Sequence, residues 1–159
     1  LDTLRTASGG KTVLVLAPGA SLAEEAGRSA VAAAKADCIV SANFCPEFCQ
    51  PDYAFFTNSK RFEKLDLAAL PCPVAAPDVQ NASLGSNSVL MLLRLLRLCG
   101  AKAVLLAGAD GYKPGTPAYA DSLLHAHTGR GAAFNTAMAG AIKACGLDVT
   151  FIPPSQYAK

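Results

Sequence analysis

The residues best suited to chemistry follow the ends of apolar runs in this chain, and the first group is Gly19, Ala20 and Ser21 after the run 13–17. Ser21 followed by Glu24 fits a capping box, which predicts that a helix begins at Ser21. Gly19 lets the backbone approach a ligand, and the N–H groups of a helix start favour an anion. We therefore expect a site for a phosphate or carboxylate here, with a plain strand-to-helix turn as the alternative.

Polar and cationic side chains follow the second and third apolar runs. Asn43 can offer both a donor and an acceptor to a base or sugar edge, and an Asx turn is the alternative. Asn58 precedes Lys60 and Arg61, which fall in the first turn of a predicted helix. Cations there are unfavourable for the helix dipole, so an anionic partner is expected unless nearby acidic residues neutralise the pair.

Two later segments carry further candidates. Ser86, Asn87 and Ser88 begin a predicted helix; Ser86 or Asn87 is expected to cap it, which leaves the other two to meet a ligand. Asp110 and Tyr112 follow the clearest apolar run, where ribose-binding or catalytic carboxylates occur in α/β folds. An ordinary Asp-Gly turn is the alternative for Asp110.

The long irregular segment 108–129 also holds both histidines, His125 and His127. A segment of this length inside a domain is usually functional, so we expect a lid over the site. Histidine exchanges protons near neutral pH, and the alternate spacing lets at most one of the two face a ligand. Asp110, His125 and His127 are therefore the catalytic candidates, and the sequence does not choose among them.

The six cysteines lack the paired spacing of structural zinc, so no metal is expected. Cys38, Cys99 and Cys145 fit small hydrophobic core residues, which favours a cytoplasmic setting. Cys45 and Cys49 are close enough to meet on one helical turn, and their role stays open.

Composition excludes several classes of protein. A hydrophobic share of 52% over 159 residues suits one domain, and a dispersed charge of +2 does not indicate a nucleic-acid surface. The longest apolar stretch, 89–98, contains Arg94 and is shorter than the roughly 20 residues of a membrane span. We expect residues 1–10 to be a linker from a removed N-terminal region and residues 11–159 to form a single domain.

Apolar runs that alternate with helical patterns predict a Rossmann-like α/β fold, a three-layer wound parallel sheet of about six strands. In such sheets ligands bind beyond the carboxyl ends of the strands, so the candidate residues should meet at one edge. The expected strands are 12–17, 37–42, 53–57, 73–76, 103–107 and 148–152, and the expected helices are 21–35, 59–70, 86–99 and 131–145.

Three motifs together resemble the C-terminal domain of bacterial HMG-CoA-lyase-like proteins often labelled 4-hydroxy-2-oxovalerate aldolases. They are Leu16-Ala-Pro-Gly-Ala-Ser-Leu22, Pro51-Asp-Tyr-Ala-Phe-Phe-Thr-Asn-Ser-Lys-Arg-Phe62 and Leu106-Ala-Gly-Ala-Asp-Gly-Tyr112. The resemblance spans most of the chain. It implies a parent lyase with an N-terminal, metal-dependent pyruvate aldolase barrel, to which this domain is an accessory.

A more distant similarity is to bacterial CMP-sialic-acid-dependent sialyltransferases, which share a turn after the first strand and a Gly-x-Asp after a late one. Departures from that pattern are Ala17 and Pro18 in the turn and Asn87 after Ser86. The positions that match are Gly19, Ser21, Asn43, Ser86, Gly108 and Asp110.

The sequence thus predicts an accessory domain of an aldolase-like enzyme that binds a nucleotide, nucleotide sugar or other small anionic ligand. One alternative is a glycosyltransferase that uses a nucleotide sugar, with a loop histidine as base. The other is a docking or oligomerisation domain with a vestigial pocket. A homo-oligomer stays open, and no nucleic acid or membrane partner is expected.

Overall fold

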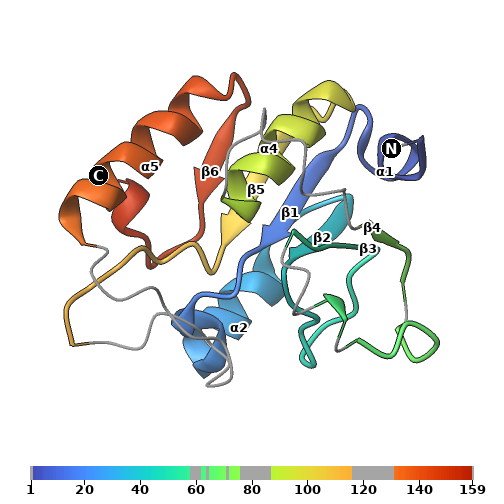
Figure 1. The fold of residues 1–159 in the computed structure, drawn as a ribbon, viewed down its shortest axis with the longest axis horizontal. Coiled ribbons are helices and arrows are strands. Elements are labelled where there is room, and N and C mark those ends of the chain that lie inside the picture. The colour runs from blue at the N-terminus through green and yellow to red at the C-terminus, as the bar shows by residue number, and fades with distance from the viewer. Residues whose placement is uncertain are drawn as a thin grey trace.

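The computed structural model describes residues 2–57, 62–63, 65–70, 72–75, 87–115 and 131–158. A six-stranded, all-parallel sheet forms its centre, with strand order β4-β3-β2-β1-β5-β6 (Figure 1). This confirms the predicted α/β fold with a Rossmann-like parallel sheet. The strands are β1 Thr12–Leu16, β2 Cys38–Ala42, β3 Tyr53–Phe55, β4 Val74–Ala75, β5 Ala103–Ala107 and β6 Val149–Phe151.

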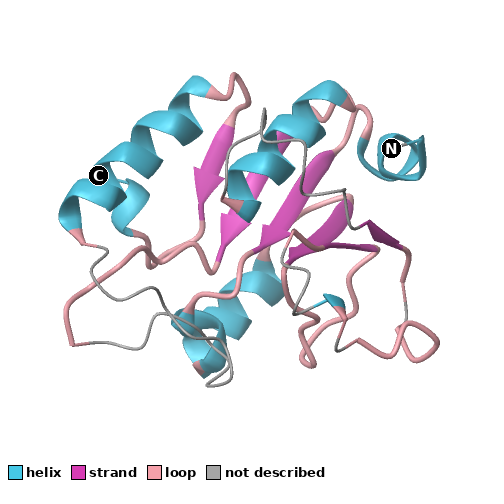
Figure 2. Cartoon of the chain, in the orientation of Figure 1, coloured by secondary structure: helices cyan, strands magenta, loops and turns pink. Residues whose placement is uncertain are grey.

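Helices cover both faces of the sheet, as Figure 2 shows. Side chains alternate between the faces of a strand, so Val13 and Val15 of β1 enter one core while Leu14 and Leu16 enter another. The larger core packs against α1 (Asp2–Ser8), α4 (Ser88–Leu98) and α5 (Ala132–Ala144). The smaller core packs against the 3-10 helix η1 (Ala20–Ala23) and against α2 (Glu25–Ala33).

Two predicted helices differ from the structure. The single helix expected over 21–35 is divided into η1 and α2, and neither begins with a side-chain cap. The capping box was wrong because the Ser21 hydroxyl donates to Asp110 instead. In the expected helix 59–70, residue 62 is helical, whereas residues 67–69 form a turn and residues 65, 66 and 70 are irregular. There Asp66 Oδ1 accepts from the Ala68 N–H at 3.1 Å, a local bond that competes with a helix.

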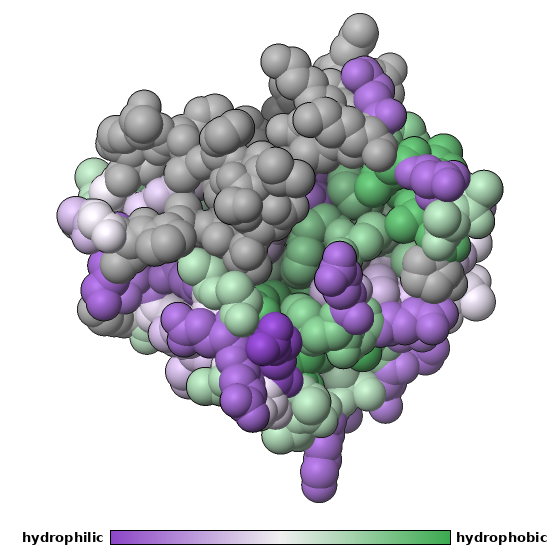
Figure 3. All heavy atoms as spheres, turned by 90° about the horizontal axis from the view of Figure 1, so that it is seen from below, coloured by the Kyte–Doolittle hydropathy of each residue, from purple (hydrophilic) through white to green (hydrophobic). Residues whose placement is uncertain are grey.

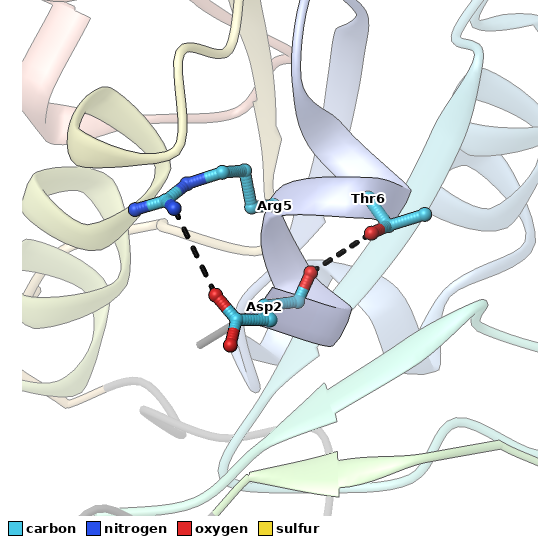
Figure 4. Close-up of polar contacts among 3 residues, drawn as sticks. All are labelled: Asp2, Arg5 and Thr6. Atoms are coloured by element: carbon cyan, nitrogen blue, oxygen red, sulfur yellow. Dashed lines mark hydrogen bonds and ion pairs between the residues drawn. The ribbon is translucent and has the colours of Figure 1, made fainter.

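The segment expected to be a linker contains α1. Its Leu4 is 2% exposed in the larger core, while Arg5 and Asp2 form a surface ion pair at 3.7 Å (Figure 4). The Thr6 hydroxyl also donates to the Asp2 carbonyl at 3.0 Å. A tie to a further domain stays a prediction.

Across the part of the chain that the structure describes, none of the helices combines the length and the apolar character needed to cross a bilayer.

Candidate functional site

The connectivity of the sheet indicates one edge as the candidate ligand site. The chain passes from β1 outward through β2, β3 and β4, and then returns to place β5 on the other side of β1. The carboxyl ends of β1 and β5 therefore flank the topological switch point, where open α/β sheets bind ligands. The arrowheads of β1, β5 and β6 in Figure 1 point to the lower side. Figure 3 views the molecule from that side and shows apolar surface near the centre, with hydrophilic residues to the right of it and below it.

Two glycines let the turns after β1 and β5 touch. The Gly19 N–H donates to the Gly108 carbonyl at 2.7 Å, which extends the pairing of the two strands. A Cβ at Gly19 would lie 2.7 Å from both Cγ and Oδ2 of Asp110. Gly108 has φ +67°, which favours glycine. The close approach that we expected Gly19 to offer a ligand is thus made by the chain itself.

Asp110 is bound to Ser21 through both carboxylate oxygens. Its Oδ1 accepts from the Ser21 hydroxyl at 2.6 Å, and its Oδ2 accepts from the Ser21 N–H at 2.7 Å. Ser21 itself is only 6% exposed. An anion does lie at the start of η1, but it is the carboxylate of Asp110, so neither Ser21 donor is free to bind an anionic ligand as we expected.

The carboxyl of Asp110 has an unusual electrostatic setting. Its burial raises the pKa above the ordinary value, the two hydrogen bonds from Ser21 act in the opposite direction, and the Glu24 carboxylate raises the pKa further. The side chain is still partly exposed. An ionised carboxylate has about four acceptor positions. Two are filled by Ser21, so Asp110 can still accept hydrogen bonds from a ligand.

Ser155 and Gln156, which the sequence did not single out, also hold the backbone of the segment after β5. The Ser155 hydroxyl donates to the Ala109 carbonyl at 2.7 Å, and the Gln156 N–H donates to the Asp110 carbonyl at 2.8 Å. Such anchoring on two sides does not fit a freely moving lid over residues 108–112. Residues 116–129 of the expected lid lie outside the described residues.

Asn135 of α5 holds the backbone of Tyr112. Its Oδ1 accepts from the Tyr112 N–H at 2.9 Å, and its Nδ2 donates to the Tyr112 carbonyl at 2.8 Å. The Tyr112 ring meets that of Phe134 edge to face, with centroids 5.2 Å apart. An asparagine inside a helix is disfavoured by propensity, and this is the one sequence signal that could have marked Asn135.

Asn43 links the ends of β2 and β3. Its Oδ1 accepts from the Thr57 N–H at 2.7 Å, its Nδ2 donates to the Thr57 hydroxyl at 3.2 Å, and its φ is 60°. The side chain is 8% exposed. Its carboxamide therefore has a structural role at this edge, and recognition of a base or sugar stays a prediction.

The start of α4 follows the sequence closely. Asn87 caps the helix, and its Oδ1 accepts from the N–H groups of Val89 and Leu90 at 3.0 and 3.3 Å. Ser88 is the first residue of α4 and is partly exposed. The remaining candidates lie outside the described residues: Asn58, Lys60, Arg61, Ser86, His125 and His127.

The three cysteines expected in the core are found there. Cys38, Cys99 and Cys145 are buried, and burial, with a smaller contribution from a neighbouring carboxylate, raises the pKa of Cys38 to about 11. Cys45 and Cys49 are free and partly buried, and they lie in bends and irregular backbone rather than on the helical turn we expected. Within the described ranges, no three histidine, cysteine or acidic residues gather to hold a metal.

Comparisons with known proteins do not extend this picture. A scan against protein-family models and searches of curated proteins and solved structures find no match to this chain. The motif resemblances therefore remain expectations.

Proposed function

We propose that this domain binds a nucleotide, a nucleotide sugar or a related small anionic molecule at the carboxyl ends of β1, β2 and β5. One observation carries the proposal: Asp110, partly exposed, bridges the turns after β1 and β5 at the switch point of the sheet. Ligands of open α/β sheets bind at that point. A carboxylate held there by two hydrogen bonds is a fixed acceptor for the donors of such a ligand.

The anionic group of the ligand needs other partners than Ser21. Both donors of Ser21 already bind Asp110, so a phosphate would have to lie further along the edge. Lys60 and Arg61, two cations close to the end of the third strand in the sequence, are the proposed partners. The Ser88 hydroxyl at the start of α4 is a second donor in this proposal.

The resemblance to aldolase-like proteins supplies the wider role in this proposal. The domain would be an accessory part of a lyase and would bind its ligand without transforming it. In the alternative of a nucleotide-sugar transferase, Asp110 or a histidine of the segment 116–130 would exchange the proton. In the docking alternative, no small ligand would bind.

A ligand screen on the 159-residue chain tests the proposal. Thermal unfolding is followed with nucleoside phosphates, CMP- and UDP-sugars, sugar phosphates and small carboxylates at millimolar concentration. A ligand at 100 times its Kd stabilises the native state by about 2.7 kcal/mol and raises Tm accordingly. The same mixtures are analysed for products by chromatography, since turnover would favour the transferase alternative.

The variant Asp110→Asn links any binding to the site. Because the Ser21 hydroxyl can accept as well as donate, asparagine can keep both contacts with Ser21 while losing the charge. Asp37→Asn is the matched control, because Asp37 also accepts a backbone N–H, from Thr12 at 2.9 Å, but at the amino end of the sheet. Stabilisation that is weakened in Asp110→Asn and kept in Asp37→Asn supports the proposal. No stabilisation by any compound would contradict it and favour the docking alternative.

A further inference from the structure

We propose that Asp110 forms a subsite for the hydroxyl-bearing sugar of the ligand, a vicinal diol, and that phosphate is excluded from this position. The inference rests on the proposed function and adds the orientation of the ligand: the sugar faces the junction of β1 and β5, and the phosphate lies away from it.

The first support is the arrangement of acceptors. Ser21 fills one acceptor position on each oxygen of the Asp110 carboxylate: its hydroxyl donates to Oδ1 and its N–H donates to Oδ2. Each oxygen therefore keeps a second acceptor position. Two adjacent hydroxyls can donate to the two oxygens of one carboxylate, and each such bond is charge-assisted and stronger than a neutral one.

The second support is the sign of the local charge. Of the charged side chains in the described ranges, the one that acts on the ionisation of Asp110 is Glu24, another carboxylate. Among the described residues, a phosphate at this position would therefore meet two carboxylates, which repel it. A sugar hydroxyl carries no charge and donates to a carboxylate, so this environment favours the sugar over the phosphate.

The third support is the fixed position of the segment that carries Asp110. Its carbonyl accepts from the Gln156 N–H at 2.8 Å, and the carbonyl before it accepts from the Ser155 hydroxyl at 2.7 Å. Two residues later, Asn135 binds both backbone groups of Tyr112. A carboxylate already held in place loses little freedom on binding, which is the condition for selective recognition of hydroxyls.

The test compares ribonucleotides with their 2′,3′-dideoxy counterparts on the native chain. Calorimetry gives Kd for AMP, CMP and UMP and for each dideoxy form. A hydrogen bond to a charged group contributes enough that losing the diol should weaken binding roughly 10- to 100-fold. In Asp110→Asn the two forms should bind with nearly equal Kd, while Asp37→Asn should keep the native preference.

A second readout does not depend on nucleotide affinity. The ¹³Cγ signals of the aspartates are followed by NMR while D-ribose or inorganic phosphate is added. We expect ribose to shift the Asp110 signal and phosphate to leave it unchanged, with the Asp37 signal as internal control.

The outcomes separate this inference from the proposed function. If nucleotides bind but the ribo and dideoxy forms do so equally, or if phosphate alone shifts the Asp110 signal, the diol subsite is wrong and nucleotide binding stands. If no nucleotide binds but ribose shifts the Asp110 signal, the subsite is supported and nucleotide binding is wrong. If neither happens, both are wrong.

Discussion

The variant Gly19→Ala tests how tightly the turns after β1 and β5 are joined. Its Cβ would lie 2.7 Å from Cγ and Oδ2 of Asp110, about 0.7 Å inside the 3.4 Å at which ordinary contact begins, and still closer to the Gly108 carbonyl. The obstacles are backbone and a hydrogen-bonded carboxylate, so neither can move aside without breaking bonds.

The expected cost follows from these contacts. Overpacking costs about 1–3 kcal/mol, and separating the turns also weakens the bond from the Gly19 N–H to the Gly108 carbonyl, worth about 1 kcal/mol. We expect Gly19→Ala to lower the free energy of unfolding by about 3 kcal/mol. Urea unfolding followed by circular dichroism measures this as a fall in midpoint of about 1.5 M, for an m-value of about 2 kcal/mol/M.

Gly140→Ala is the matched control. A Cβ at Gly140 meets nothing within 4 Å, and the residue lies inside α5. Alanine is the better helix former there, so this variant should be more stable by up to about 1 kcal/mol. A Gly19→Ala midpoint within experimental error of the native chain, or a fall matched by Gly140→Ala, would refute the close contact of the two turns.

Three further predictions concern the side chains around the site and in the core. Burial raises the pKa of Asp110 in the folded chain above its value in the unfolded chain. The contribution of this group to the free energy of unfolding is therefore full at a pH below the unfolded pKa, and it is lost as the pH rises through the folded pKa. Asp110→Asn removes that loss, and urea unfolding from roughly pH 3 to 7 should show its stability relative to the native chain improving with pH; a constant difference would contradict this. Asn135→Ala removes two hydrogen bonds to the backbone of Tyr112 and should lower the free energy of unfolding by about 1–3 kcal/mol. The control Thr136→Ala, at an exposed neighbour, should change it by no more than about 0.5 kcal/mol, and equal effects of the two variants would contradict the role of Asn135. Cys38, with a pKa of about 11 and 2% exposure, should resist iodoacetamide at pH 8 until the chain unfolds, as mass spectrometry of labelled peptides would show; rapid labelling of the native chain would disprove its burial.

Local patterns in the sequence determined most of the secondary structure. The run 103–107 is β5 with the same bounds, and the helix expected over 86–99 is α4 with Asn87 as its cap. These predictions work because apolar periodicity and caps depend on residues within a few positions of one another. The helix 59–70 fails over residues 65–70 for an equally local reason, since Asp66 binds the backbone two residues ahead.

The sequence also placed Gly19, Ser21 and Asp110 among the candidates at one edge of the sheet, but it did not pair Ser21 with Asp110. Ser21 was assigned to a cap because the only partner visible nearby in the chain was Glu24. In the folded chain a carboxylate from 89 residues away takes both of its donors.

Ser21 binds Asp110 rather than Glu24 because of the arrangement of the sheet. It places β5 beside β1, so the two turns meet where Gly19 leaves room for Asp110. Asn135 and Ser155 act on the same segment from 23 and 46 residues away in the chain. Sequence alone therefore determined which residue types stand at the strand ends, while tertiary structure decided their partners, because hydrogen bonds form between groups adjacent in space whatever their separation along the chain.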